Sequence, residues 1–233
     1  MNEAGPRIEP QNARGKFITL EGGEGTGKTT QLARILAWLQ QLGIETVGTR
    51  EPGGSPGAEL LRGVLLSGTV SKLGPAAEAI LFAAARIDHI ATTIEPALAA
   101  GKFVVCDRYA DSTRAYQGAR GDIDPRFLRA LERVTLGNVR PDLTLIFDLP
   151  AAEGLARAAA RRKEDETPDR FEGEDLQFHE NLRAAYLALA AAEPGRCTII
   201  DASCTEEEVA QSVFEIISNR LLAPAAARLA QGS

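Results

Sequence analysis

One stretch decides the fold of this chain: Glu21-Gly22-Gly23-Glu24-Gly25-Thr26-Gly27-Lys28-Thr29-Thr30. From Gly22 to Thr29 it reads G-x-x-x-x-G-K-T, and it directly follows the apolar run Phe17–Leu20. Leucine and isoleucine then recur at helical spacing as far as Leu42. A strand, a glycine-rich turn and a helix in this order are the context of a phosphate-binding P-loop. The sequence therefore predicts a nucleotide site at this turn.

The P-loop pattern assigns roles to its own residues. Glycines let the backbone wrap closely, so that several N–H groups point at one anion at the start of a helix. Lys28 is expected to reach the β- and γ-phosphates, and the Thr29 hydroxyl to bind Mg²⁺. We therefore expect the nucleotide to be bound by Gly22, Gly23, Glu24, Gly25, Thr26, Gly27, Lys28, Thr29 and Thr30. The alternative is a tight turn that contains a lysine by chance, which is disfavoured because the chain has only five lysines.

Composition narrows the classes of function. The 233 residues suit one large α/β domain, and the net charge of −6 argues against a broad basic surface for nucleic acid. The three cysteines are odd in number and lack metal-type spacing, which fits a reducing compartment. Neither a membrane-spanning stretch nor the apolar core of a signal peptide is found. We expect a cytoplasmic protein with no membrane partner and no nucleic-acid partner.

Short apolar runs alternate with helical patterns along the chain. The runs predict strands over 17–20, 44–49, 103–106, 143–147 and 197–201, and the patterns predict helices over 28–42, 58–66, 75–99, 111–117, 125–136, 151–162, 171–192 and 206–222. Pro96 is expected to kink or end the third of these helices. This alternation predicts an α/β fold, a three-layer αβα P-loop domain with a parallel five-stranded sheet surrounded by helices. We expect one kinase domain over 15–222, a disordered extension over 1–14 and a flexible tail over 223–233.

The third strand delivers a carboxylate to the edge of the sheet where ligands bind. Asp107 follows the apolar run Val104–Cys106, and the carboxyl ends of parallel strands meet beside the P-loop. Asp107 is expected to hold Mg²⁺ directly or through water. The alternative is that Asp107 caps the following helix.

Two groups of side chains have the chemistry of an acceptor site. After Asp107 come Arg108, whose fork matches a phosphate, and a hydroxyl, phenol and amide set formed by Ser112, Tyr116 and Gln117. On the long helix, Phe82 and Arg86 are four residues apart and would offer a base an aromatic platform and a bidentate donor. The alternatives are solvated surface for the first group and plain core for Phe82.

A charged segment follows the helix over 151–162. It contains Arg157, Arg161, Arg162 and Lys163, then acidic residues, then Arg170. Such a segment is often only a solvated face. Because it lies in a chain with a nucleotide site, we also expect a lid over about 157–170 whose arginines fold over the phosphates.

Together these motifs resemble the thymidylate (dTMP) kinases, a family of P-loop nucleoside-monophosphate kinases. The resemblance extends from about Phe17 to about Leu222 and rests on Glu21–Thr30, Thr49-Arg50-Glu51-Pro52-Gly53-Gly54, Leu81–Arg86, Asp107-Arg108-Tyr109 and Ala115-Tyr116-Gln117-Gly118. It implies in-line transfer of the γ-phosphoryl group of ATP to dTMP, with Mg²⁺ as cofactor and dTDP and ADP as products. It also implies a homodimer.

The resemblance further implies roles for single residues. Phe82 would stack on thymine and Arg86 would bond its O4. Ser112 and Gln117 would lie along the pyrimidine, and Tyr116 would crowd the 2′ position. Glu24 would meet the sugar 3′-OH, and Arg50 and Arg108 would hold the acceptor phosphate.

The family also places its catalytic arginine in one of two positions. Some members carry it in the P-loop after the acidic residue, where this chain has Gly25, and others, mostly bacterial, carry it in the lid. The chain resembles the second type, in which Lys28 and Arg108 act with lid arginines drawn from Arg157, Arg161 and Arg162. The sequence does not decide which lid arginine reaches the phosphoryl group.

Three other functions compete with this interpretation. A kinase for another nucleoside monophosphate or for a deoxynucleoside is the nearest, although Arg50 and Arg108 favour a phosphorylated acceptor. A GTP-binding switch would carry an Asn-Lys-x-Asp motif, which the sequence lacks. A non-catalytic nucleotide-binding module is disfavoured by Lys28, Thr29 and the lid arginines.

Overall fold

A computed structural model describes residues 14–120, 123–161, 171 and 173–223 of this chain. The expected N-terminal extension lies outside the described residues except for Arg14, and the expected tail except for Ala223. Of the expected lid over about 157–170, the described part ends at Arg161. Arg162 is therefore outside the described residues.

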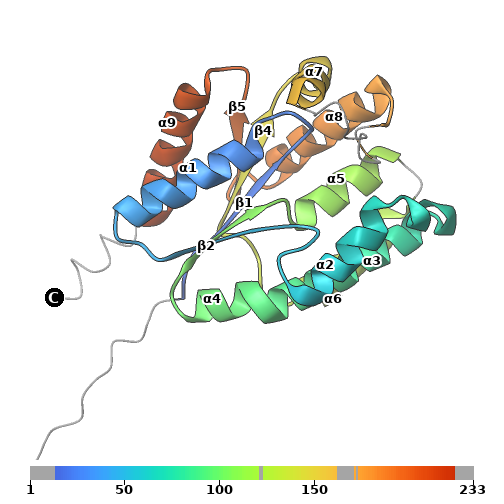
Figure 1. The fold of residues 1–233 in the computed structure, drawn as a ribbon, viewed down its shortest axis with the longest axis horizontal. Coiled ribbons are helices and arrows are strands. Elements are labelled where there is room, and N and C mark those ends of the chain that lie inside the picture. The colour runs from blue at the N-terminus through green and yellow to red at the C-terminus, as the bar shows by residue number, and fades with distance from the viewer. Residues whose placement is uncertain (1–13, 121–122, 162–170, 172, 224–233) are drawn as a thin grey trace, which may run out of the picture.

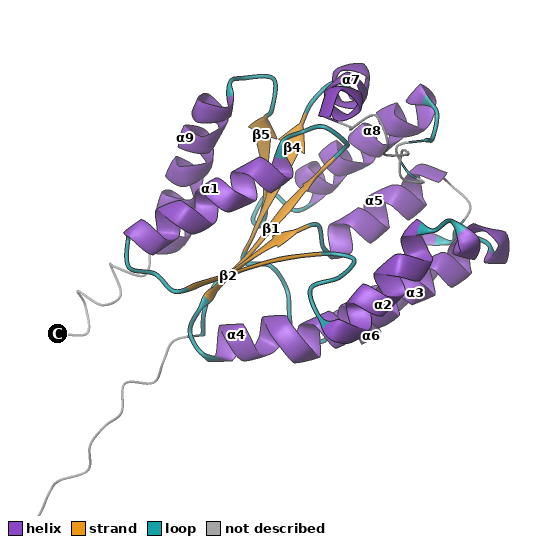
Figure 2. Cartoon of the chain, viewed as in Figure 1, coloured by secondary structure: helices purple, strands orange, loops and turns teal. Residues whose placement is uncertain are grey.

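A parallel five-stranded sheet forms the centre of the fold (Figure 2). The strands follow the order β2-β3-β1-β4-β5 and comprise β1 (Phe17–Gly22), β2 (Thr46–Arg50), β3 (Phe103–Asp107), β4 (Leu143–Asp148) and β5 (Cys197–Asp201). In the register of the sheet Leu20 lies opposite Asp107 on one side and Leu145 on the other. All carboxyl ends therefore reach one edge, at which the P-loop begins.

Helices cover both faces of the sheet, as Figure 1 shows. On one face α1 (Lys28–Gln41) and α9 (Glu206–Ile217) bury Ile18 and Leu20 of β1. The other face carries the remaining helices, which are α2 (Pro56–Leu66), α3 (Pro75–His89), α4 (Glu95–Ala99), α5 (Ala110–Arg120), α6 (Pro125–Leu136) and α8 (Leu176–Ala192), while α7 (Ala151–Arg161) lies over the carboxyl edge. The predicted three-layer αβα class is confirmed.

The long helix predicted over 75–99 changes its hydrogen-bond pattern before Pro96. A π-helical segment, Ile90–Ile94, joins α3 to α4, and Pro96 lies in the first turn of α4. A proline at that position removes a donor that the first turn of a helix does not need. The helical segment therefore continues to Ala99 instead of ending at the proline. A second π-helical segment, Ser218–Leu222, extends α9 at its carboxyl end.

One helix begins later than predicted, and one short helical segment was not predicted. The helix predicted over 171–192 begins only at Leu176, because the Asp175 side chain accepts a hydrogen bond from the Phe178 N–H at 2.8 Å and caps it. Phe171 lies in a turn before this helix. A 3₁₀ segment, Thr69–Leu73, was not predicted. Within the described part of the chain, no helix is both long and apolar enough to cross a membrane.

Two isoleucines that are register partners in β4 and β5 differ in how deeply their side chains are buried. Ile146 is 1% exposed and Ile199 is 48% exposed. Ile146→Ala removes buried methyl groups and leaves a cavity, so we expect the free energy of unfolding to fall by about 2–5 kcal/mol in urea denaturation. The matched control, Ile199→Ala, should cost about 1 kcal/mol or less. Equal losses would contradict this packing.

Candidate active site

The P-loop holds its lysine against its own backbone. Lys28 Nζ donates to the carbonyl oxygens of Gly22 and Gly23 at 3.1 and 2.6 Å and to Thr26 Oγ1 at 3.1 Å. Burial, and then the nearby Arg108 guanidinium, lower the pKa of Lys28 to about 8. The lysine is thus fixed at the start of α1, where the backbone N–H groups of a P-loop point toward an anion.

Gly25 is the P-loop residue next to Glu24, and a close approach between two backbones excludes a side chain there. Gly25 has φ +68°, and a Cβ atom on it would overlap the carbonyl group of Gly154 in α7. A Cβ atom on Gly154 would in turn meet the Glu24 carbonyl. The P-loop and α7 therefore pack through two glycines, and the P-loop has no room for a side chain at position 25.

Thr29 and Asp107 form a pair suited to a divalent cation. The Thr29 hydroxyl donates to Asp107 Oδ2 at 2.9 Å. The second oxygen, Oδ1, is buried and has no partner among the described residues. No group of three or more His, Cys, Asp or Glu side chains in the described part could hold a metal by itself. This donor set fits Mg²⁺, which is commonly held by one or two protein oxygens together with phosphate oxygens.

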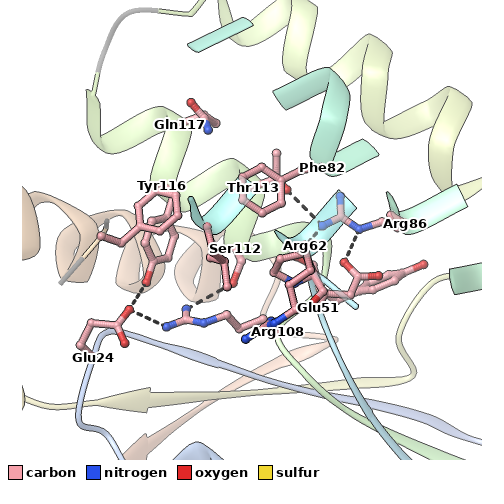
Figure 3. Close-up of a pocket in the computed structure, with 14 residues that line it drawn as sticks. Glu24, Glu51, Arg62, Phe82, Arg86, Arg108, Ser112, Thr113, Tyr116 and Gln117 are labelled. Carbon is pink, nitrogen blue, oxygen red and sulfur yellow. Dashed lines mark hydrogen bonds and ion pairs between the residues drawn. The ribbon is translucent and has the colours of Figure 1, made fainter. Parts of the chain in front are cut away.

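A cavity beside the P-loop, called the main cavity here, collects most of the predicted acceptor residues (Figure 3). Its walls come from the P-loop, the loop after β2, α2, α3, α5 and the turn before α8. The lining includes Glu24, Glu51, Pro52, Arg62, Phe82, Arg86, Arg108, Ser112, Thr113, Tyr116, Gln117 and Phe171. Of the residues expected to bind an acceptor, all but Arg50 lie here.

Arg108 connects this cavity to the P-loop. Its backbone is left-handed, with φ 66°, and its guanidinium donates to the Gly22 carbonyl at 3.0 Å and to Glu24 Oε1 at 2.7 Å. The Tyr116 hydroxyl donates to the same Glu24 oxygen at 2.5 Å, and the guanidinium lies 5.1 Å from the centre of the Tyr116 ring. Burial raises the pKa of Glu24, but the charges of Arg108 and Lys28 outweigh burial and lower that pKa to about 2.

Ser112 is fixed by a carboxylate that the sequence analysis did not single out as a site residue. Its hydroxyl donates to Glu21 Oε2 at 2.6 Å, and Glu21 also accepts from the Tyr109 N–H and the Tyr186 hydroxyl. Burial and the nearby Asp111 raise the pKa of Glu21 to about 7. Gln117 lines the cavity with a buried Oε1 that has no partner among the described residues.

Arg50, Arg157 and Arg161 lie outside the main cavity. Arg50 lines a neighbouring cavity with Thr29, Asp107 and Arg108, where it pairs with Glu59 at 3.1 Å. Arg157 donates to the Ala202 carbonyl at 2.9 Å and to Glu153 at 2.6 Å. Together with Arg161 it lines a third cavity, called the P-loop cavity here, whose other walls include Gly25, Thr26, Gly27 and Thr30.

Several residues that line the main cavity were not predicted from the sequence. Glu51 lies in the glycine- and proline-rich loop, which signalled a shaped turn but no role for its carboxylate. Phe171 reaches the cavity from a turn that was predicted to be helix, and its ring lies 5.0 Å from that of Tyr116. Thr113 and Arg62 carried no signal beyond their polarity, because only the packing of α2 and α5 brings them to this cavity.

The fold, together with the P-loop and the main cavity beside it, defines a class of protein. A P-loop with a candidate Mg²⁺ pair lies next to a second, aromatic and arginine-lined cavity, as in kinases that phosphorylate small molecules. A sequence model described as thymidylate kinase matches residues 20–213. The chain belongs to the thymidylate kinase family.

Individual relatives agree with this membership. The chain is 55% identical over 215 residues to a thymidylate kinase of Bradyrhizobium diazoefficiens, covering 92% of this chain and 94% of that protein. It is 52% identical over 227 residues to one of Nitrobacter winogradskyi, covering 97% of each. The crystal structure of thymidylate kinase from Ehrlichia chaffeensis matches with a TM-score of 0.71 and 30% identity over 88% of this chain and 99% of that one.

The low pKa of Glu24 predicts a pH-dependent contribution to stability. Because the folded pKa of about 2 lies below the ordinary 4.5, the ionised carboxylate stabilises the fold above about pH 4.5 and loses this effect as the pH falls toward 2. Glu24→Gln should lower the free energy of unfolding by about 1–3 kcal/mol at pH 6. The difference from the wild type should narrow at pH 3.

Urea denaturation at both pH values measures this effect. Glu95→Gln, at an exposed position, is the control for losing one negative charge. A deficit of Glu24→Gln that is the same at pH 3 and pH 6 would show that the ion pair with Arg108 does not stabilise the fold.

Proposed function

We propose that this chain transfers the γ-phosphoryl group of ATP, with Mg²⁺ as cofactor, to the phosphate of dTMP and so produces dTDP and ADP. Membership of the family makes the chain a dTMP kinase, an enzyme of nucleotide biosynthesis. The observation that carries the proposal is that Arg108, which lines the main cavity, donates to both Gly22 and Glu24 of the P-loop. One guanidinium thereby sits where a donor and an acceptor phosphate would meet.

The donor side follows from the P-loop. The N–H groups of Gly22 to Thr30 would hold the phosphates, and Lys28 would leave its carbonyl partners for the phosphate oxygens. Thr29 and Asp107 would hold Mg²⁺, which neutralises charge on the phosphates. Support comes from the buried Asp107 oxygen that has no partner among the described residues.

The acceptor side follows from the main cavity. Phe82 and Arg86 line it together, so that the ring would stack on thymine while the guanidinium bonds to O4. Ser112 and Gln117 would lie along the pyrimidine. Tyr116, fixed by its bond to Glu24, would face the sugar and favour deoxyribose, and Glu24 itself would meet the 3′-OH.

Catalysis would then require only alignment and charge neutralisation. Phosphoryl transfer needs the two phosphates in line and positive charge around the transferred oxygens. Lys28 and Arg108 would supply part of that charge, and Arg50, from the neighbouring cavity, would help to hold the acceptor phosphate. Because Gly25 leaves no room for an arginine, we assign the remaining charge to the segment with Arg157, Arg161 and Arg162. Closure of this segment would also exclude water, which otherwise competes as the acceptor.

We also propose that the enzyme is a homodimer in the cytoplasm. Large apolar side chains are exposed on α2, α3 and the segment between them, namely Leu60, Val64, Leu73, Ile80 and Ile87. Exposed apolar side chains on two helices that pack against each other fit an interface between two copies. Cys106, Cys197 and Cys204 are free thiols, in keeping with a reducing compartment.

A panel of acceptors tests the proposed function. We expect ADP release with ATP and dTMP to exceed that with UMP, CMP or thymidine by at least about tenfold in kcat/KM, because each rival loses a contact of the base, the sugar or the phosphate. Omitting Mg²⁺ should abolish the signal. If UMP or CMP served as well as dTMP, or if thymidine were the better acceptor, the assignment would be wrong.

A further inference from the structure

Arg86 is held by a buried carboxylate behind the main cavity. Arg86 is 5% exposed and Glu51 is 6% exposed, and Arg86 Nε donates to Glu51 Oε2 at 2.6 Å. Nη2 donates to the Tyr109 carbonyl and to Thr113 Oγ1, both at 3.1 Å. Nη1 has no hydrogen-bond partner among the residues that the structure describes. Since Arg86 lines the cavity, Nη1 is the nitrogen left for a ligand.

Glu51 is held in turn by His89. The ring of His89 is fully buried, and its Nδ1 lies 3.1 Å from Glu51 Oε1. A carboxylate only accepts, so Nδ1 donates. On the other side of the ring, Nε2 lies 2.7 Å from Thr49 Oγ1. A chain of hydrogen bonds therefore runs from Thr49 in β2 through His89 and Glu51 to the guanidinium of Arg86 (Figure 3 shows its end at Glu51 and Arg86).

The loop after β2 is shaped around this chain. Gly54 has φ +81°, and a Cβ atom on it would overlap Thr49 Oγ1 and His89 Nε2. The Gly54 carbonyl accepts from Thr93 Oγ1 at 2.8 Å, which fixes the loop against the segment that follows α3. Glycine at this position therefore leaves the space that the His89 ring and the Thr49 hydroxyl fill.

We propose that Glu51 and His89 are positioning residues that fix the guanidinium of Arg86 and so set the choice between pyrimidines at position 4. The proposal rests on the proposed function, in which Arg86 faces that position of the base. An arginine nitrogen only donates, so it pairs with the carbonyl of thymine or uracil and opposes the amino group of cytosine.

The fixed orientation of the Arg86 guanidinium is what makes the amino group of cytosine unfavourable. A free guanidinium would turn away from an amino group and leave room for water between them. Held at Nε by Glu51 and at Nη2 by Tyr109 and Thr113, the guanidinium of Arg86 cannot turn without breaking buried hydrogen bonds. With cytosine in the cavity, its amino group and the Arg86 guanidinium would therefore be two donors that face each other, and no hydrogen bond could form between them.

Glu51→Gln tests the carboxylate. An amide has one oxygen and no charge, so it cannot accept from both Arg86 and His89, and its bond to the guanidinium is weaker than that of a carboxylate. We expect the ratio of kcat/KM for dTMP over dCMP to fall by about tenfold or more. The ratio for dTMP over dUMP, which differ only in the methyl group, should not change. Loss of fold stability alone would lower kcat/KM for dTMP, dCMP and dUMP together. It would leave the dTMP over dCMP and dTMP over dUMP ratios unchanged.

A matched pair at position 89 tests the histidine and keeps the proposal testable if Glu51→Gln does not fold. In His89→Asn the amide nitrogen takes the place of Nδ1 and still donates to Glu51. In His89→Gln the nitrogen lies instead near the place of Nε2, beside Thr49. We expect the Asn variant to keep the dTMP over dCMP ratio within about twofold, and the Gln variant to lose several-fold.

The wild type separates this inference from the function on which it rests. A wild type that phosphorylates dCMP as well as dTMP would overturn the proposed function. If the wild type prefers dTMP but the ratio is the same in all folded variants, or if His89→Asn and His89→Gln change it equally, only the positioning role is overturned. Melting temperatures of each variant establish which of them are folded.

Discussion

The contact on which the rest of the site depends is that of the Arg108 guanidinium with the P-loop. One side chain from the end of β3 donates to the Gly22 carbonyl and to the Glu24 carboxylate, and it stacks on Tyr116. Its left-handed backbone aims it back across the sheet edge instead of along α5. One residue thereby fixes the P-loop relative to the main cavity.

Burial of charge explains why this contact holds. Lys28, Arg108, Glu21 and Glu24 lie together in a region where an unpaired charge is costly, and each is balanced by a partner of opposite sign or by hydrogen bonds. Glu21 is the last residue but one of β1 and accepts from three donors on α5, α8 and the turn after β3. The wall of the main cavity is thus hydrogen-bonded to the strand that leads into the P-loop.

The sequence allowed much of this to be predicted, for physical reasons that differ by residue. Lys28, Asp107 and Arg108 could be predicted as site residues because strand ends and a glycine pattern are local signals. Glu51 was missed as a partner of Arg86, 35 positions away, and Tyr186 lies 165 positions from Glu21. Such pairs depend on how helices pack on the sheet, which no local pattern encodes. The late start of α8 was missed because its periodicity extends past the Asp175 cap.

Arg108→Lys separates the charge of this residue from its shape, because lysine keeps the charge but loses the fork that reaches Gly22 and Glu24 together. We expect kcat with dTMP to fall by about a hundredfold or more in this variant. The KM for ATP should change little, since Lys28 and the P-loop backbone remain. A kcat within a few-fold of the wild type in Arg108→Lys would contradict the claim that this guanidinium joins the donor and acceptor sites.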